Sequence, residues 1–568
     1  MKASDYIAEF LVSNGVSVVT EMCGGMTTHM LDSLSRRPEV RIVPMHHEQA
    51  AAFAAEAVAR MSGVPGVSMA TSGPGATNLI TGIGSCYFDS TPALFITGQV
   101  NTHELRGDSA VRQAGFQETD IVAMVAAITK GAWQVPDAAE LPRMLEDAFR
   151  LALEGRPGPV LLDIPMNVQR QEVDALVPLV ASPVPAECAD IEPLIAALSA
   201  ARTPLVLAGG GVRSSGAVGA LRRFVEQFQI PVVTSLMGVD VLPFGHPERV
   251  GLIGSYGNRW GNLVMAEADL LLILGARLDV RQTGADLDAF RSGKTIVQVD
   301  LDEKQLEWRI TPDIAIRSDI GTFLAALEER SAGISCATRE EWHRRIAEIV
   351  GAWPIDGESR DVSGIDPLKV VERLAEAIPT ATAYVTDVGQ NQMWAAQAVR
   401  LHEDQRFLTS GGMGAMGFGL PAAIGVALAE SGRPVIVISG DGGMQVNLQE
   451  LETVARLGLE LKIVVFDNKC LGMVRQFQDE YFEGRHQSTV WGYGSPDFVA
   501  VANAFGIDAR GVSAPGELDE ALDWLARPTG RPALLHVVLS RSTLVRPKVS
   551  FGRPIYEMDP PPADGGAA

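Results

Sequence analysis

Short apolar runs alternate with longer helical patterns along most of the chain. Residues 41–45, 66–70 and 93–97 are apolar runs of strand length, and an Ala-rich helical pattern at 48–60 lies between the first two. Strands that alternate with helices are typical of parallel α/β sheets, in which crossover helices cover the faces. The pattern therefore predicts an α/β fold with mainly parallel sheets flanked by helices.

The same alternation recurs further along the chain. Additional apolar runs of strand length lie at 204–211, 270–275, 295–300, 383–387, 434–438, 462–466 and 533–539. A stretch rich in Pro, Val and Ala at 177–186 and a polar stretch at 355–364 separate the groups of runs, and a chain of 568 residues is long enough for three or four domains. We predict three domains of one broad architecture and a Pro-, Gly- and Ala-rich tail, with bounds at 1–170, 187–335, 366–545 and 546–568.

Charge and composition exclude several classes of partner. The chain has 47 Lys and Arg against 69 Asp and Glu, a net charge of −22, which disfavours nucleic acid and anionic membranes as partners. Five cysteines without CxxC spacing predict neither a disulfide framework nor a zinc site. The N-terminal segment lacks the apolar region of a signal peptide, and no uncharged stretch is typical of a membrane span. We therefore expect a cytoplasmic protein of enzyme size.

Two polar residues lie where long apolar runs stop. Asp441 follows the run at 435–440, and Asn468 follows the run at 462–466 after one further aspartate. If these runs are buried parallel strands, both residues lie at the strand ends where ligands bind in open α/β sheets. A carboxylate and an amide oxygen suit Mg²⁺, and Gly442 allows close approach of a phosphate, with a helix expected near Asn447. The pattern predicts a Mg²⁺–diphosphate site; the alternative is an ordinary Gly-Asp-Gly turn.

Other positions have both a functional and a structural interpretation. Glu48 opens a helix directly after two histidines, and it either compensates the helix dipole near solvent or is a buried carboxyl that shares a proton with a ring nitrogen. The Gly-rich turn at 72–78 either binds an anion or only makes the turn. The glycines at 209–211 follow a strand but do not complete GxGxxG, and Asp300 either binds a ribose hydroxyl or caps the next helix.

Together these motifs resemble one family. The chain resembles thiamine-diphosphate-dependent enzymes of the acetolactate (acetohydroxyacid) synthase family over nearly all of its length, including paralogues that transfer an acetyl unit to other acceptors. Each motif is modest alone, but all occur in order and at the family's spacing. The resemblance rests on residues 47–51, 70–78, 115–118, 156–159, 275–277, 386–390, 410–421 and 440–442 together with Asn468.

The resemblance implies where thiamine diphosphate and Mg²⁺ bind. It implies that Glu48 hydrogen-bonds the aminopyrimidine ring, that the Gly414 carbonyl receives the 4′-amino group, and that Met416 wedges beneath the cofactor. The implied Mg²⁺ ligands are Asp441, Asn468 and the backbone carbonyl of Cys470. The other implied contacts of the cofactor are Asn78, Val388, Gly389, Gln390, Asn391, Gly440, Gly442 and Gly443.

The resemblance also implies a shared active site. The pyrimidine would lie on the first domain of one subunit and the diphosphate on the third domain of another, so that a homodimer is the smallest working unit and a tetramer is the alternative. Asn391 stands where the family usually has histidine, and an asparagine can still donate a hydrogen bond to the diphosphate.

The middle domain resembles the flavin-binding domain of the synthases, in which FAD is structural and not a redox partner. Residues 278–281 depart from the family's usual sequence, so loss of the flavin, or an adenine nucleotide in its place, stays open. The positions that match FAD contacts are Arg156, Gly209, Gly210, Arg277, Asp300 and Asp319.

Two departures from the family concern the substrates. Met166 replaces a usual lysine and Phe477 replaces a usual tryptophan, which implies a different second substrate, either larger or without a carboxylate. Phe116 and Gln117 are kept, which fits a pyruvate-derived donor, and Gly25 completes the implied substrate positions.

The predicted activity is carboligation. The enzyme would decarboxylate pyruvate, a 2-keto acid donor, and transfer the two-carbon acetyl unit to a second carbonyl, which is either pyruvate or a ketone such as a keto-sugar nucleotide. The alternatives on the same scaffold are a flavin-dependent pyruvate oxidase or decarboxylase and a cyclic-diketone hydrolase. A non-enzymatic scaffold protein is disfavoured because Glu48, Asp441 and Asn468 are all intact.

Overall fold

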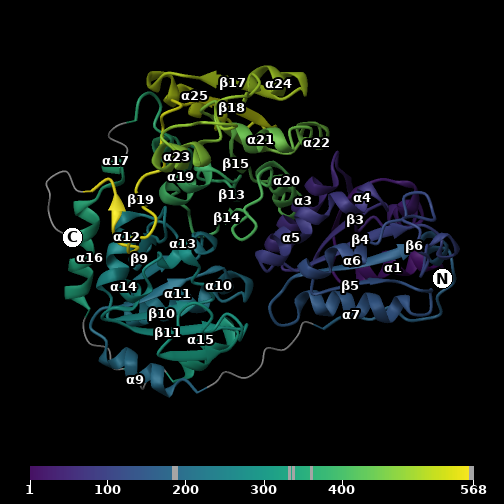
Figure 1. The fold of residues 1–568 in the computed structure, drawn as a ribbon, viewed down its shortest axis with the longest axis horizontal. Coiled ribbons are helices and arrows are strands. Elements are labelled where there is room, and N and C mark those ends of the chain that lie inside the picture. The colour runs from purple at the N-terminus through teal and green to yellow at the C-terminus, as the bar shows by residue number, and fades with distance from the viewer. Residues whose placement is uncertain (182–189, 331–333, 335–338, 359–361, 562–568) are drawn as a thin grey trace.

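The computed structural model of the protein describes residues 1–181, 190–330, 334, 339–358 and 362–561 (Figure 1). Part of the predicted linker (182–186), Cys188, Cys336 and the end of the predicted tail (562–568) lie outside the described residues. Three helix-flanked sheets are arranged around the centre of the molecule, with the middle sheet at the lower left of Figure 1 and the first sheet at the right.

The first sheet has six parallel strands in the order β2-β1-β3-β4-β6-β5. Its strands are β1 (Val18–Met22), β2 (Arg41–Pro44), β3 (Gly66–Ala70), β4 (Ala93–Gln99), β5 (Gly131–Gln134) and β6 (Pro159–Pro165). The helices around it are α1 (Ala3–Ser13), α2 (Thr28–Ser35), α3 (Glu48–Ser62), α4 (Pro74–Asn78), α5 (Ile80–Phe88), α6 (Ile121–Val125), α7 (Leu141–Leu153) and α8 (Met166–Gln169).

The middle sheet also has six parallel strands, in the order β12-β11-β10-β7-β8-β9. The strand order reverses between β7 and β10, as in dinucleotide-binding folds. The strands are β7 (Pro204–Ala208), β8 (Val232–Thr234), β9 (Arg249–Leu252), β10 (Leu270–Leu274), β11 (Thr295–Asp300) and β12 (Ile314–Arg317). The helices are α9 (Glu192–Ala200), α10 (Gly210–Ser214), α11 (Val218–Phe228), α12 (Arg259–Glu267), α13 (Val280–Thr283), α14 (Leu287–Arg291), α15 (Ile320–Glu329), α16 (Glu340–Ala352) and α17 (Ile355–Glu358).

The third sheet repeats the topology of the first, with parallel strands in the order β14-β13-β15-β16-β18-β17. Its strands are β13 (Ala383–Thr386), β14 (Arg406–Leu408), β15 (Val435–Gly440), β16 (Leu461–Asp467), β17 (Asp508–Val512) and β18 (Ala533–Val538), and a separate antiparallel pair is formed by β19 (Lys548–Val549) and β20 (Met558–Asp559). The helices are α18 (Pro367–Ala377), α19 (Gln390–Ala398), α20 (Gly419–Ala429), α21 (Asp441–Val446), α22 (Glu450–Leu457), α23 (Gly472–Tyr481), α24 (Phe498–Ala504) and α25 (Leu518–Leu525).

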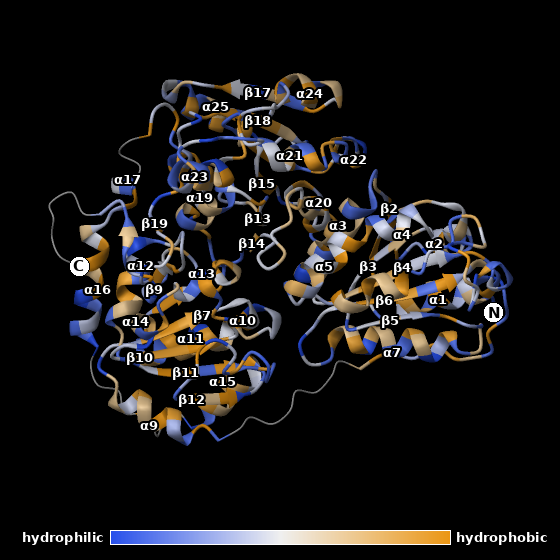
Figure 2. Ribbon diagram, viewed as in Figure 1, coloured by the Kyte–Doolittle hydropathy of each residue, from blue (hydrophilic) through white to orange (hydrophobic). Residues whose placement is uncertain are grey.

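The first and third domains share one apolar core. Helices α3 and α20 pack so closely that a Cβ at Gly425 would lie 2.2 Å from the carbonyl oxygen of Ala54. The rings of Phe53 and Phe418 pack edge to face beside them, with their centroids 5.4 Å apart. Hydrophobic residues are concentrated on strands such as β6 and β7 (Figure 2), where both faces are covered by helices.

The predicted fold class is confirmed: three domains, each with a six-stranded parallel sheet between helices. Among the described residues, no helix has the length and the apolar character that a membrane crossing requires.

Candidate active site

The ends of three neighbouring strands form the edge where the diphosphate site was predicted. Because β13, β15 and β16 are adjacent and parallel, Asp387, Asp441 and Asn468 follow them at one edge of the third sheet. The helix expected near Asn447 corresponds to α22, which begins at Glu450, but a further short helix that was not predicted, α21, already begins at Asp441. The glycines after Asp441 adopt the helical conformation directly instead of forming a longer turn.

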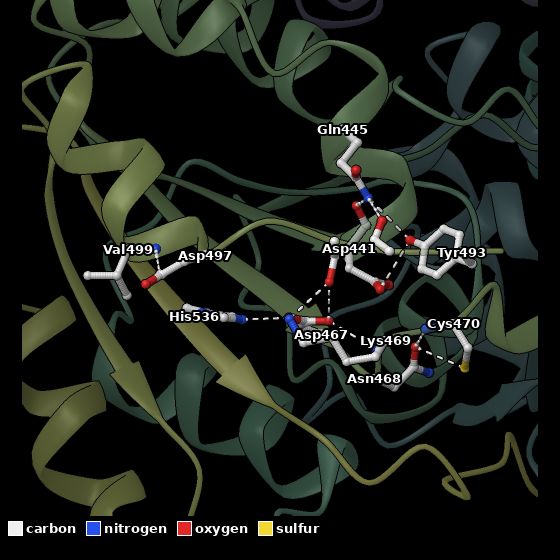
Figure 3. Close-up of polar contacts among 12 residues, drawn as sticks. Asp441, Gln445, Asp467, Asn468, Lys469, Cys470, Tyr493, Asp497, Val499 and His536 are labelled. Atoms are coloured by element: carbon white, nitrogen blue, oxygen red, sulfur yellow. Dashed lines mark hydrogen bonds and ion pairs between the residues drawn. The ribbon is translucent and has the colours of Figure 1, made fainter. Parts of the chain in front are cut away.

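Asp441 lies beside a second carboxylate, Asp467 (Figure 3). Asp467 is held by His536 Nε2 at 2.8 Å and Lys469 Nζ at 2.6 Å, and these partners outweigh burial and lower its pKa. Burial raises the pKa of Asp441 to about 7, and the charge of Asp467 adds to the effect, while the Tyr493 hydroxyl donates to Asp441 at 3.1 Å. A divalent cation at this point would supply the positive charge that Asp441 lacks. The donor set therefore fits Mg²⁺.

Asn468 is oriented by a neighbouring amide. Its Nδ2 donates to Oε1 of Gln390 at 2.9 Å, so its Oδ1 is the atom left to bind a cation. The backbone N–H and the thiol of Cys470 both lie 3.3 Å from that oxygen. Burial raises the pKa of the Cys470 thiol to about 11, so the thiol is uncharged at neutral pH and the backbone carbonyl is the better cation ligand. No cluster of three or more His, Cys, Asp or Glu that could hold a metal occurs in the described ranges, so the donors here are mixed.

The glycines after β15 leave the backbone open. A Cβ at Gly443 would lie 2.2 Å from Oδ1 of Asp387, and a Cβ at Gly442 would lie 3.1 Å from Cε of Met416. Gly440 is similarly restricted by Oδ1 of Asn391, 3.1 Å from its Cβ position. Only glycine fits at Gly443 without displacing a neighbour, and the bare backbone is what a phosphate needs for close approach.

Asp387 connects the strand edge to the segment that contains Met416. Its carboxylate accepts the backbone N–H groups of Val388 at 2.8 Å, Gly417 at 3.0 Å and Gly419 at 2.8 Å. Burial raises the pKa of Asp387 to about 6, and the three N–H donors oppose this shift. Asp387 belongs to the 386–390 motif, but its role in binding these N–H groups was not predicted from the sequence. The sequence feature that could have indicated the role is its position directly after a buried strand.

The amides after β13 are already engaged within the protein. Gln390 Nε2 donates to Gln476 Oε1 and to the Thr543 carbonyl, both at 3.2 Å. Asn391 Nδ2 donates to the carbonyls of Asp387 at 2.7 Å and Ile438 at 3.2 Å. A hydrogen bond from Asn391 to a diphosphate would therefore need one of these bonds to break. The Val388 N–H is likewise engaged by Asp387, and the next residue, Gly389, has φ +151°.

Glu48 is buried at the edge of the first sheet, with 6% of its surface exposed. Asn78 Nδ2 donates to its Oε2 at 2.9 Å, and a Cβ at Gly75 would lie 3.2 Å from its Oε1. The residue after Glu48 reaches the third domain, because Gln49 Oε1 accepts from Asn447 Nδ2 at 3.3 Å. Across the described ranges, no hydrogen bond or ion pair joins Glu48 to Asp441 within one chain.

The candidate substrate residues lie on separate elements of the first and third domains. Phe116 is 81% exposed, and Gln117 has φ +65° and lies against Gly73. Phe477 on α23 is 51% exposed, and its ring contacts are Tyr481 and Phe482 of its own domain. The remaining candidates are Gly25, which begins a 3-10 turn at 25–27, and Met166, which begins α8.

The glycines after β7 lie at the reversal point of the middle sheet. A Cβ at Gly209 would lie 2.2 Å from the Gly275 carbonyl oxygen, and one at Gly210 would lie 3.1 Å from Cβ of Met237. Dinucleotides bind at this point in such sheets. Burial raises the pKa of Asp300, which accepts the Asp302 N–H at 2.9 Å.

The other candidate nucleotide contacts have partners within the chain. Arg156 bonds Ser90 at 2.8 Å and pairs with Asp302 at 3.2 Å. Arg277 lies 3.8 Å from Asp279, and Asp319 caps α15. These contacts neither require nor exclude a bound nucleotide.

Sequence reasoning missed Asp467 and Tyr493. Asp467 stands directly before Asn468, so its position offered a signal; Tyr493 approaches Asp441 from 52 residues away and offered none.

Three family models match the chain. They are described as the N-terminal TPP binding domain, the central domain and the C-terminal TPP binding domain of thiamine pyrophosphate enzymes, and they match residues 1–124, 191–327 and 387–537.

Curated relatives extend along the whole chain. The acetolactate synthase isozyme 1 large subunit of Escherichia coli (strain K12) is 36% identical, over 98% of this chain and 97% of the relative. The acetolactate synthase large subunit of Lactococcus lactis subsp. lactis (strain IL1403) is 34% identical, over 98% and 95%. The probable acetolactate synthase large subunit of Methanocaldococcus jannaschii is 37% identical, over 95% and 92%.

Proposed function

The chain belongs to the thiamine pyrophosphate enzyme family, as an enzyme of the acetolactate synthase type, and on that premise we propose that it decarboxylates pyruvate and transfers the two-carbon acetyl unit to a second carbonyl compound. The observation that most supports this is the pairing of Asp441 and Asn468 at neighbouring strand ends, beside glycine backbone that a diphosphate can approach. When bound, thiamine diphosphate would supply the carbanion and the electron sink that decarboxylation requires.

The residues of the third domain would hold the diphosphate end. Asp441, Oδ1 of Asn468 and the carbonyl of Cys470 would bind Mg²⁺, while Asp467 stays anchored by His536 and Lys469. Met416 lies over Gly442 and would limit the space above the diphosphate end.

The first domain would supply the proton-handling group. Glu48 is buried, and Asn78 engages its Oε2, while its Oε1 accepts no hydrogen bond in the described part of the chain. That oxygen is free to hold a proton against a ring nitrogen.

Two copies of the chain would complete each site. In the described part of the chain no hydrogen bond or ion pair joins Glu48 to Asp441, and Met416 and Val446 are exposed, which supports a site completed by a second copy. Co-expression of Glu48→Gln with Asp441→Ala tests it. If each site combines Glu48 of one copy with Asp441 of the other, mixed dimers contain one intact site and about a quarter of wild-type activity returns. If each chain forms its own site, two inactive variants stay inactive together.

The middle domain would bind FAD in a non-redox role. The reversal of strand order between β7 and β10 and the close approach of Gly209 to Gly275 support a dinucleotide there. The visible absorption spectrum of the purified protein tests this, with Gly209→Val as the variant that should lose any flavin.

The acceptor is tested by product identification. Purified protein with thiamine diphosphate, Mg²⁺ and pyruvate is offered pyruvate, 2-ketobutyrate and simple ketones. We expect CO₂ release together with a new C–C bond, with Met166 and Phe477 favouring an acceptor other than 2-ketobutyrate. Flavin reduction coupled to turnover would instead indicate a pyruvate oxidase. Absence of pyruvate decarboxylation in every condition would overturn the proposal.

A further inference from the structure

The segment between β14 and α20 contains both Gly414 and Met416 and is anchored at its two ends. At its far end the carboxylate of Asp387 accepts the N–H of Gly417 at 3.0 Å. At its near end Gln392 Nε2 donates to the carbonyl of Ser410 at 3.2 Å. Both anchors belong to the third domain.

A third anchor comes from the first domain. Asp89, directly after α5, accepts the backbone N–H of Gly411 through Oδ2 at 2.9 Å and that of Gly412 through Oδ1 at 2.6 Å. The fit requires glycine, because a Cβ at Gly412 would lie 2.9 Å from Oδ1 of Asp89 and 2.8 Å from Cβ of Phe88. One carboxylate thus holds two consecutive peptide groups of another domain.

Burial raises the pKa of Asp89, while the charge of Arg60 and the N–H groups of Gly411 and Gly412 oppose that shift. Arg60 on α3 donates from Nη1 to the Thr409 carbonyl at 2.8 Å, and its other neighbour is Glu56, at 3.6 Å. Burial raises the pKa of Glu56 to about 8, and the charge of Asp89 adds to the effect, so Glu56 is mainly neutral at neutral pH. The charge of Arg60 is then left to balance Asp89.

We propose that Asp89 is a positioning residue, which holds the 411–413 backbone from the first domain and thereby sets where the Gly414 carbonyl and the Met416 side chain stand. The inference rests on the proposed function, because the roles of the Gly414 carbonyl and of Met416 toward the cofactor are those that the family resemblance implies for a thiamine-diphosphate enzyme. It adds a residue that touches neither cofactor nor substrate and acts through the backbone of another domain.

The effect of losing Asp89 is local. The anchors at Ser410 and Gly417 stay in place without it, whereas 411–413 lose their two backbone hydrogen bonds. Gly414 has φ +65°, and no atom lies within 4 Å of its Cβ position. The restraint next to it is the Ala415 N–H, which donates to Ser410 Oγ at 3.2 Å within the same segment. Small displacements of a group that acts on a reacting atom can reduce rates by about 10- to 100-fold.

The test is Asp89→Asn, with Asp163→Asn as the matched control. Asparagine keeps the shape but turns an amide N–H toward the N–H of Gly411 or Gly412. Asp163 is a buried aspartate of the same domain that accepts from Thr97, Gln99 and Gln134, and in the described part of the chain it forms no hydrogen bond or ion pair with the third domain. The readout is the hydrogen–deuterium exchange rate at C2 of bound thiamine diphosphate, measured by NMR after acid quench at saturating cofactor.

We expect exchange at least about 10-fold slower in Asp89→Asn and within about twofold of wild type in Asp163→Asn. Exchange within twofold of wild type in Asp89→Asn would overturn the proposal, and so would equal slowing in both variants. The C2 exchange rate does not depend on the acceptor. If the wild-type protein exchanges the C2 hydrogen but forms no C–C product, the proposed function is refuted, and the exchange rates of the variants can still be compared.

A second variant disturbs the contact with Asp89 by changing the glycine and not the aspartate. Gly412→Ala pushes the segment away from Asp89 without removing a buried charge, and Gly516→Ala is its control, since nothing lies within 4 Å of that Cβ position. Slowed exchange in Gly412→Ala alone supports the proposal even where Asp89→Asn does not fold. Unchanged exchange in a folded Gly412→Ala protein overturns it.

Discussion

The first and third domains have the same strand order, but their acidic residues lie at different places in that order. In both, the helix after the second strand packs at the centre of the molecule, as α3 and α20. Helix α3 begins with Glu48, whereas α20 begins with Gly419. The turn after the third strand is uncharged at Gly73–Gly75 in the first domain but contains Asp441 in the third.

The difference shows which properties come from topology and which from side chains. Both sheets present strand ends and a glycine turn at one edge, where ligands bind. A buried acid on the central helix suits a ring nitrogen, whereas an acid on the turn suits a cation and its phosphates. The same scaffold therefore serves two ends of one cofactor through the position of one carboxylate in each domain.

The largest expected effect comes from removing the acid of the first domain. Glu48→Gln keeps the Asn78 contact but loses the proton-holding group, so kcat should fall by about 10²- to 10⁴-fold. Affinity for Mg²⁺ and thiamine diphosphate, measured by calorimetric titration, should stay near wild type. Full turnover in this variant would break the assignment of roles to the two domains.

Removing the acid of the third domain should act on binding instead. Asp441→Ala leaves Asn468 as the only side-chain ligand, and Mg²⁺ affinity should fall by about 100-fold or more. Part of the lost activity should return at high Mg²⁺, which Glu48→Gln cannot show. Unchanged Mg²⁺ affinity in a titration would contradict the cation site.

The shared helix interface can be broken by one methyl group. Gly425→Ala places a Cβ 2.2 Å from the backbone of Ala54, so α3 and α20 must separate, at a cost of roughly 3 kcal/mol in the free energy of unfolding. Gly511→Ala, where the Cβ meets only Cγ2 of Val499 at 3.5 Å, is the control. Equal denaturation midpoints for the two variants would mean that the interface tolerates expansion.

The smallest effect concerns pH. Helix α3 contains the buried Glu56, close to Asp89 and Arg60, whereas α20 has no ionisable side chain. Because the pKa of Glu56 is raised to about 8 in the folded state, folding binds a proton between the usual Glu pKa and 8, and this contribution to stability is lost as pH rises through that range. The stability of Glu56→Gln relative to wild type should therefore rise by up to about 1.4 kcal/mol for each pH unit between pH 5 and pH 8. Parallel thermal unfolding curves for the two proteins across that range would contradict the buried, protonated state.

Much of the site was predictable because it depends on local pattern. Asp441 and Asn468 were placed correctly at the ends of β15 and β16, since an apolar run that stops at a polar residue marks the end of a buried strand. Glu48 opens α3 as predicted. Helix α21 was not predicted, because a strand can pass directly into a helix through glycine without a signal several residues long.

The sequence by itself determined the fold class, the family and the residues at the strand ends, because each depends on neighbours within a few positions. Tertiary structure alone decided the protonation of Asp441, which depends on Asp467 and burial, and the use of both amide hydrogens of Asn391. It also brought Asp89 to Gly411 across 322 residues. Such contacts depend on how whole domains pack, and the pKa of a carboxyl group and the partner of an amide follow from that packing rather than from the adjacent residues.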